Sequence, residues 1–514
     1  MSIQSTQPNP AQTESSGSAF YAGRGVSKTP MINHAKGIFF WDTEGKRYLD
    51  GSSGAVAANI GHGNERVRDA MMEQASRFSY VVRTAFTSES TETLCKMVAD
   101  LAGPGFDQTF LVSGGSEAIE ATLKLARQYA VVSGQPKRSK ILARMPGYHG
   151  STMGAAAVTG DPDRDEMFGP MMRIMPKIPA PLSYRLPEGF DVNSYADYCA
   201  NELERQILAE GEDTVLAFIM EPVGGVATGA LVAPDHYYKT VREICDRYGV
   251  LLIFDEVMCG AGRTGTFLAA HHWPDALPDL VACAKGLSAG YTPLGAMIAP
   301  NRIVDKVVES GGFLHGHTYS GNPLSSAIGV AVLTELVNQD LMRNADRMGV
   351  LLRQRLTTLK ERTSTIGDVR GMGLLNAVEI VRDKATKEIF PASSQASYRV
   401  SAIARDLGLH IYGRRAAGGS SVNGSWQLLR SSSPNKKLTS SWNCLQRRFA
   451  FLKASFDEAC SNLFCFERTG TSRIQHKHET CSRGELRRSW FSNVPYSGSD
   501  GMAAAVPPSS GASL

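Results

Sequence analysis

Two unbroken apolar runs in the middle of the chain constrain its fold more than any other feature. Residues 251–257 read LLIFDEV, and residues 280–286 read LVACAKG. Each run carries charge only near its C-terminal end, which is typical of a strand buried on both faces of a parallel sheet. We therefore predict that Asp255 and Lys285 lie at the same edge of such a sheet.

An acid and a lysine at neighbouring strand ends suit the chemistry of a pyridoxal cofactor. This cofactor needs a lysine amine to form a Schiff base and a carboxylate to keep its pyridine nitrogen protonated. Asp255 and Lys285 supply these two groups. The pair alone leaves an alternative open, in which Asp255 caps the following loop and Lys285 is an ordinary solvated lysine.

A third apolar run, residues 109–112, leads into the small-residue loop SGGS and then into a helix expected to reach about Tyr129. The first turn of a helix offers unpaired N–H groups and a positive dipole end, which together bind phosphate. Gly115 and Ser116 would lie in that turn. The alternative is an ordinary helix cap with a glycine turn, and the loop matches neither GxGxxG nor a P-loop.

Further candidate groups follow two more predicted strands, residues 140–144 and 215–220. Tyr148 and His149 come after the first, in the sequence PGYHG, and Glu221 comes after the second. An aromatic side chain on such a loop can stack on a flat heteroaromatic ring, although a tyrosine that closes the core fits equally well. Strands and helices alternate here, and open α/β sheets bind ligands at the carboxyl ends of their strands. The signals thus converge on one sheet edge of an α/β fold.

Composition limits the other possibilities. The chain has 514 residues, which is long enough for two or more domains, and 42% of them are hydrophobic and 20% charged. No apolar run has transmembrane length and the first twenty residues lack a signal-peptide pattern, so we expect a soluble cytoplasmic protein without a membrane partner. The nine cysteines show no CxxC spacing, so neither a disulfide framework nor a metal site is predicted.

The net charge of +4 is unevenly placed. From Ser420 onward there are twelve Lys and Arg against six Asp and Glu, whereas the rest of the chain has 42 against 44. The body of the protein is therefore near neutral, and no nucleic-acid partner is indicated.

The remaining chain is expected to be organised as follows. Residues 1–27 are a flexible polar arm, and two short strands flank a turn at 43–45. A helix follows at 65–78, helices at 323–338 and 341–361 lead into a smaller C-terminal domain, and residues 369–379 form a turn and a strand.

With these motifs in order, residues 28–419 resemble the class III (omega) aminotransferases, which are fold-type I pyridoxal-phosphate enzymes. The resemblance implies a large domain with a mostly parallel central sheet and a smaller α+β domain. It implies these boundaries: an N-terminal segment that joins the small domain (28–60), a large cofactor-binding domain (61–325) and an incomplete small domain (326–419).

The resemblance also assigns roles to residues. Lys285 would carry pyridoxal phosphate as a Schiff base and later move a proton, and Asp255 would pair with the pyridine nitrogen. Thr318 would reach the phosphate from the neighbouring subunit, which implies a homodimer with shared sites. The other implied cofactor contacts are Gly115 and Ser116 at the phosphate, Tyr148 on the ring, Glu221 near the 3-hydroxyl, and His149 and Val257.

The implied reaction is ping-pong transamination from an amine or omega-amino acid donor to a keto acid such as pyruvate. Other reactions occur among class III relatives and stay open as alternatives: racemisation, 1,2-amino migration and decarboxylation. A non-catalytic paralogue is a further alternative because of the C-terminal sequence. Product analysis with and without pyruvate separates these reactions, since only transamination needs the acceptor.

Two departures from the family pattern matter. Many relatives have a tryptophan where this chain has Val56, so we expect a roomier substrate pocket. The pattern also stops after Gly419, and we interpret 420–514 as an atypical, disordered tail. Another reading frame of codons for residues 436–444 can encode EADELVEL, the acidic helix expected there, so a frameshift is our hypothesis. Arg414 or Arg415 could still bind a substrate carboxylate by a bidentate contact.

Overall fold

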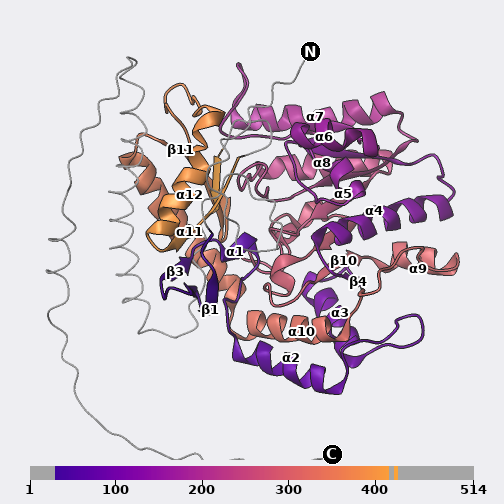
Figure 1. The fold of residues 1–514 in the computed structure, drawn as a ribbon. Helices are drawn as coiled ribbons and strands as arrows, with labels where there is room; N and C mark the ends of the chain where they lie inside the picture. The colour runs from indigo at the N-terminus through magenta and orange to yellow at the C-terminus, as the bar shows by residue number, and fades with distance from the viewer. Residues whose placement is uncertain (1–28, 416–421, 426–514) are drawn as a thin grey trace, which may run out of the picture. The chain divides into compact units, whose positions relative to one another are not determined.

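The computed structural model describes residues 29–415 and 422–425, which contain three sheets (Figure 1). The central sheet has seven strands in the order β4-β10-β9-β8-β7-β5-β6. In chain order these strands are β4 (Gln108–Val112), β5 (Lys140–Met145), β6 (Lys177–Pro179), β7 (Val215–Met220), β8 (Leu251–Asp255), β9 (Leu280–Cys283) and β10 (Gly295–Ala299).

The central sheet is mostly parallel, as predicted. Strands β6, β5, β7, β8 and β9 pair in parallel, and only β10 runs antiparallel, against both β9 and β4. The two apolar runs that began the sequence analysis form the neighbouring strands β8 and β9. Their register places Asp255 opposite Ala282, three residues before Lys285. The predicted α/β fold and the shared sheet edge are therefore confirmed.

Side chains of the central strands alternate between two apolar cores, one on each face of the sheet. Phe218, Leu252 and Phe254 belong to the core formed with helices α3 (Glu89–Ala102), α7 (Val192–Glu210), α8 (Asp235–Tyr248) and α10 (Pro323–Asn338). Ile219 and Ile253 belong to the core formed with α4 (Gly115–Val132), α5 (Met153–Val158) and α9 (Asn301–Glu309). Burial on both faces explains why the strands read as continuous apolar runs.

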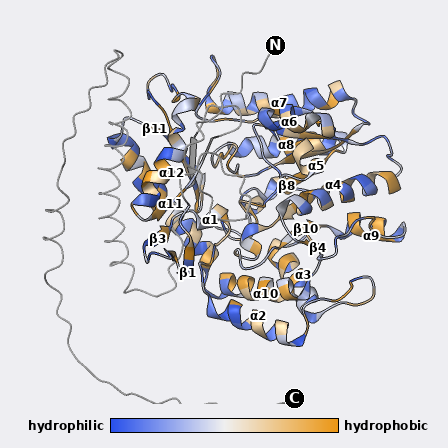
Figure 2. Cartoon of the chain, in the orientation of Figure 1, coloured by the Kyte–Doolittle hydropathy of each residue, from blue (hydrophilic) through white to orange (hydrophobic). Residues whose placement is uncertain are grey.

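Helix α10 packs against both α3 and α2 (Glu65–Arg77). Many residues of α10 are buried, whereas α2 buries only Val67 and Gln74. Figure 2 shows the matching difference in hydropathy, with α2 bluer than α10. Asn64 caps α2 by accepting a hydrogen bond from the Val67 N–H at 3.2 Å, which fits the predicted helix start.

Two four-stranded sheets accompany the central one. The first has the order β1-β2-β3-β13, and the second β11-β12-β15-β14. Their strands are β1 (Ile32–Lys36), β2 (Phe39–Asp42), β3 (Arg47–Asp50), β11 (Ile366–Met372), β12 (Leu375–Ile380), β13 (Leu409–His410), β14 (Tyr412–Arg415) and β15 (Val422–Ser425).

These smaller sheets differ from the sequence predictions at three places. Strand β1 was not predicted. Residues 369–379 were expected to hold one strand, but they belong to the hairpin of β11 and β12, whose turn contains Gly373 with φ +52°. Strand β15 lies inside the segment interpreted as a disordered tail, and it pairs with β12 and β14. The rest of that tail, and the N-terminal arm, lie outside the described residues.

The remaining helices are α1 (Ser53–Val56), α6 (Pro162–Phe168), α11 (Leu341–Arg362) and α12 (Ala396–Asp406). Within the described ranges, no helix is both long enough and apolar enough to cross a membrane. Cys95, Cys199, Cys245, Cys259 and Cys283 are free thiols.

Candidate active site

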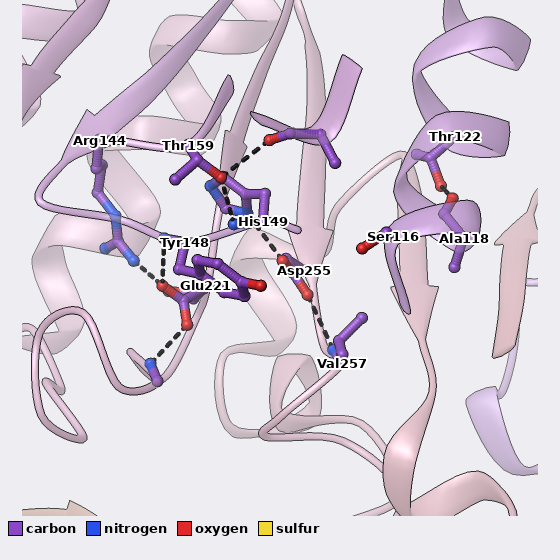
Figure 3. A network of polar contacts seen from close by, with 12 residues as sticks. Ser116, Ala118, Thr122, Arg144, Tyr148, His149, Thr159, Glu221, Asp255 and Val257 are labelled. Carbon is purple, nitrogen blue, oxygen red and sulfur yellow. Dashed lines mark hydrogen bonds and ion pairs between the residues drawn. The ribbon is translucent and has the colours of Figure 1, made fainter. Parts of the chain in front are cut away.

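Four neighbouring strands of the central sheet, β5, β7, β8 and β9, end at one edge with polar side chains. His149 follows β5, Glu221 follows β7, Asp255 ends β8, and Lys285 follows β9. Figure 3 shows His149, Glu221 and Asp255 gathered at this edge, with Ser116 on the neighbouring helix. The structure thus brings together residues that lie far apart in the sequence.

Asp255 is held by two hydrogen bonds. Its Oδ2 accepts from His149 Nδ1 at 2.8 Å, and its Oδ1 accepts from the Val257 N–H at 3.0 Å. Because an ionised carboxylate only accepts, the histidine proton is assigned to Nδ1. The backbone N–H of His149 donates to Thr159 Oγ1 at 2.9 Å. The side chains of His149 and Asp255 are both buried, so the orientation of the Asp255 carboxylate is well fixed.

Glu221 is a second buried acid at this edge. Its Oε1 accepts from the Tyr148 N–H at 3.3 Å, and its Oε2 accepts from the Gly225 N–H at 2.6 Å. Arg144 donates to the backbone carbonyl of Glu221. Burial and the neighbouring charge of Asp255 raise the pKa of the Glu221 carboxyl, and the Arg144 cation and the Gly225 N–H only partly oppose this. A Cβ at Gly225 would lie 2.5 Å from Glu221 Oε2, so a larger residue here would displace the Glu221 carboxylate.

Lys285 has an unusual backbone conformation, with φ at +45°. This left-handed conformation costs a residue with a side chain about 1 kcal/mol, and such outliers often mark functional sites. Burial lowers the pKa of the Lys285 amine, while the charges of Asp255 and Glu221 act in the opposite direction. A lowered pKa leaves more of the amine neutral, and the neutral amine is the nucleophile.

The N-terminus of α4 faces this edge and has an open first turn. Its capping residue, Gly114, has extended backbone and no capping side chain. A side chain at Gly115 would lie 2.7 Å from Val257 Cγ1, so glycine lets the helix end approach the strand that carries Asp255. Ser116 Oγ accepts from the Ser151 N–H at 3.0 Å, which leaves the hydroxyl proton available to donate. This arrangement suits a phosphate.

These groups together fit pyridoxal phosphate. The edge offers the amine of a half-buried lysine, an oriented carboxylate, an open helix N-terminus and, on the loop after β5, the half-buried ring of Tyr148. The Arg164 guanidinium lies 5.3 Å from the centre of this ring. Within residues 29–415 and 422–425, no group of three or more acidic, histidine or cysteine side chains could hold a metal ion.

Four other predicted site positions come from other segments of the chain. Val56 is buried and ends the short helix α1 with φ +67°. Ser53 and Gly54 of the same helix also have positive φ. Thr318 is exposed on the segment between α9 and α10. Arg414 and Arg415 belong to β14, but their side chains lie outside the described residues. The predicted roles of these residues stay predictions.

The sequence analysis missed several groups that support the site. Thr159 gave no signal, because its bond to the His149 backbone depends on how α5 folds back toward β5. Arg144 did give one, since it is a cation inside an otherwise apolar buried strand. Such a residue needs a buried acceptor, which here is the backbone at Glu221.

A mostly parallel sheet with a lysine, an acid and an open helix N-terminus at one edge defines a pyridoxal-phosphate-dependent enzyme of the α/β type. Residues 21–417 match the family model described as aminotransferase class-III, and the chain belongs to this family. It is a class III aminotransferase, which uses pyridoxal phosphate to move an amino group from an amine donor to a keto acid.

Several curated relatives carry related names. An uncharacterized aminotransferase of Bacillus subtilis, YodT, is 37% identical over 76% of this chain and 88% of its own length. The diaminobutyrate–2-oxoglutarate transaminase of Halomonas elongata is 36% identical over 73% of this chain and 81% of its own. The putrescine–pyruvate aminotransferase of Pseudomonas aeruginosa is 33% identical over 70% and 79%.

Solved structures agree with this assignment. The amine transaminase of an uncultivated Pseudomonas species, in its pyridoxal-phosphate-bound form, superimposes with a TM-score of 0.76 at 33% identity. The match covers 88% of this chain and 99% of that structure.

Proposed function

We propose that Lys285 forms the covalent bond to pyridoxal phosphate and then moves the proton at the reacting carbon of the substrate. The observation that carries this proposal is the position of Lys285 just after β9. Burial there lowers the pKa of its amine, although the charges of Asp255 and Glu221 act in the opposite direction. Its lowered pKa leaves more of the amine in the neutral form that attacks an aldehyde and accepts a proton.

The other residues take supporting roles in this proposal. Asp255, oriented by His149 and Val257, holds a proton on the pyridine nitrogen. Gly115 and Ser116 bind the phosphate through the first turn of α4. Tyr148 stacks on the ring, and Glu221 lies near the 3-hydroxyl. When bound, pyridoxal phosphate supplies an aldehyde for the donor amine and a ring that stabilises negative charge.

The visible absorption spectrum tests the proposal. The chain purified with pyridoxal phosphate should show the band of the lysine linkage, and an amine donor should bleach the band until pyruvate restores it. Borohydride reduction followed by peptide mass mapping should place the cofactor on Lys285, and Lys285→Ala should lose the band. Attachment to another lysine would contradict the assignment. If the chain shows no band but a version with the restored C-terminal frame does, the tail is the cause.

The proposed donor is an amine or omega-amino acid, and the proposed acceptor is a keto acid such as pyruvate. The relatives from Pseudomonas aeruginosa and Halomonas elongata are named for putrescine with pyruvate and for diaminobutyrate with 2-oxoglutarate. A first panel should therefore combine diamines and aryl amines with these two acceptors. Product formation without an acceptor would indicate racemisation, amino migration or decarboxylation instead.

Val56 sharpens the donor proposal. Val56 stands where many relatives have tryptophan, so we expect room for a bulky amine. Val56→Trp should lower kcat/KM for a bulky donor about tenfold, roughly the discrimination that a filled apolar pocket gives. The same variant should leave a small donor within about twofold of the unaltered enzyme, and equal losses on both donors would contradict the proposal.

We also propose a homodimer with shared active sites, in which Thr318 of one subunit reaches the phosphate bound by the other. Support comes from the exposure of the segment that carries it, since Leu314 is 86% exposed and Tyr319 65%. The proposed compartment is the cytoplasm, consistent with the five free cysteines among the described residues.

A further inference from the structure

One buried amide connects the turn that carries Lys285 to two distant parts of the chain. The side chain of Asn59, from the loop after α1, donates through Nδ2 to the Ala261 carbonyl at 2.9 Å and to the Gly286 carbonyl at 3.1 Å. Ala261 lies in the loop after β8, and Gly286 directly follows Lys285. The amide therefore joins the loop after α1, the loop that continues from Asp255, and the turn of residues 284–289 that carries Lys285 (the lysine turn).

The two acceptors determine which way the amide points. Both are carbonyl oxygens, so only the nitrogen of Asn59 can face them. Its Oδ1 is buried and has no hydrogen-bond partner among the described residues. An unpaired buried acceptor is unfavourable. The two hydrogen bonds from Nδ2 thus keep the Asn59 amide in this orientation, although its Oδ1 is left unpaired.

The contact between the amide and the lysine turn is tight. A side chain at Gly286 would place its Cβ 2.7 Å from Asn59 Nδ2 and 3.0 Å from Ala261 Cβ. No side chain therefore fits between Asn59 and the turn. A shift of the Asn59 amide would move the backbone next to Lys285.

The lysine turn needs such a hold because its conformation is unfavourable. Lys285 has φ +45°. The local bonds of the turn are the Leu287 N–H to the Ala284 carbonyl at 3.0 Å, the Ser288 N–H to the Lys285 carbonyl at 3.2 Å and the Ala289 N–H to the Gly286 carbonyl at 3.3 Å. These bonds lie within the turn and do not tie it to the sheet edge that carries Asp255. Asn59 supplies that connection through Ala261.

We propose that Asn59 is a positioning residue for transamination, whose amide fixes the turn that aims the Lys285 amine at the reacting atoms. This inference rests on the proposed role of Lys285. Asn59 itself touches the two backbone carbonyls and acts only through Lys285. Because displacements of about 1 Å at a reacting group cost up to about 100-fold in rate, loss of the amide should reach the chemical step.

The test is a pH titration of the visible band of the cofactor-loaded Asn59→Ala variant. We expect the midpoint of the titration to shift by about one pH unit, because the Lys285 nitrogen, now bonded to the cofactor, is no longer held at its place relative to Asp255. We also expect kcat to fall about tenfold, with KM for the donor within about twofold. Asn59→Leu keeps a similar size and loses the donors without adding a charge, and it should show the same change, which provides a second variant if Asn59→Ala fails to fold.

Asn376→Ala is the matched control. Asn376 is also fully buried, and it too makes two hydrogen bonds, donating to the Gly373 carbonyl at 2.8 Å and accepting from Arg353 at 3.2 Å. It does not contact the lysine turn. Both alanine variants should lower Tm, but only Asn59→Ala should shift the titration midpoint.

An unchanged midpoint in a folded Asn59 variant, or equal shifts in both alanine variants, would overturn the inference. Borohydride mapping of the unaltered protein separates this failure from failure of the proposed function. If the cofactor is on Lys285 but the midpoint does not move, only the role of Asn59 is wrong.

Discussion

Two regions near the candidate site differ in how far the chain itself buries and hydrogen-bonds their side chains. In the Asp255 cluster, formed by Tyr148, His149, Glu221 and Asp255, both carboxylates receive hydrogen bonds from the same chain. The segment of residues 311–322 is anchored by Gln128, which bonds Gly312 and Leu314, but it leaves Leu314, Thr318 and Tyr319 exposed. The cluster is formed by residues of this one chain, whereas the segment leaves three side chains exposed.

The strongest test of the cluster is Asp255→Ala. Loss of the carboxylate removes the charge proposed to keep the pyridine nitrogen protonated, so kcat/KM should fall about 1,000-fold, as when a preorganised electrostatic partner is removed. Steady-state kinetics with a saturating keto acid would measure this. A loss of less than about tenfold would show that the cluster is structural.

His149→Ala should have a smaller effect, because it leaves the acid in place but removes one of its two orienting bonds. We expect kcat/KM to fall about 30-fold, with Tm lowered by the loss of a buried hydrogen bond. A matched comparison is Thr159→Val, which removes the acceptor of the His149 backbone N–H and should have a still smaller effect. Equal effects on activity from Thr159→Val and Asp255→Ala would contradict this order.

The segment is tested by Thr318→Ala, which should weaken cofactor binding about tenfold, the worth of one hydrogen bond to a charged group. Complementation sharpens the comparison. When Thr318→Ala and Lys285→Ala subunits are mixed and allowed to exchange, a heterodimer contains one site with both native residues. At a cofactor concentration well below the dissociation constant of Thr318→Ala, activity per subunit should therefore rise above that of either variant alone. No gain despite verified subunit exchange would place Thr318 outside a shared site.

The last expected effect is on stability and not on activity, and it concerns Glu256, the buried acid beside the cluster. Its two oxygens accept from the N–H groups of Ala269 and Ala270, both at 2.7 Å, and burial raises its pKa to about 7. The folded state thus binds this proton more tightly than the unfolded state, whose pKa is near 4.5. Stability should fall as the pH rises from about 4.5 to 7, by up to about 3 kcal/mol.

Calorimetry of the unaltered chain and Glu256→Gln across this pH window checks the effect. The variant should lack this part of the decline in Tm. Parallel curves for the two proteins would show that Glu256 does not titrate in this window. The titrating carboxyl lies within one subunit, so the difference between the curves should not depend on protein concentration.

The sequence predicted the central sheet well because burial on both faces leaves a direct signal. The apolar runs became β8 and β9, and the charges at their ends placed Asp255 and Lys285 at one edge. The hairpin of β11 and β12 was missed because Arg370 and Gly371 interrupt its apolar pattern. Strand β1 was missed because most of its residues are exposed.

Within the candidate site, the sequence could predict which residue types follow which strands, but not how they pair. The bond between His149 and Asp255 joins residues 106 positions apart, and the bonds of Asn59 span more than 200. No periodic pattern records such contacts. Positive φ at Lys285 is also invisible in the sequence, since lysine has no preference for that conformation.

The single antiparallel strand of the central sheet fixes the distance between two parts of the candidate site. Strand β10 separates β4, which leads to the helix end proposed to hold phosphate, from β9, which leads to Lys285. Two strand spacings amount to about 10 Å, and backbone hydrogen bonds set this length. Substitutions of side chains can therefore reshape what surrounds a bound molecule, but the span between its two anchors would change only if a strand were lost or inserted.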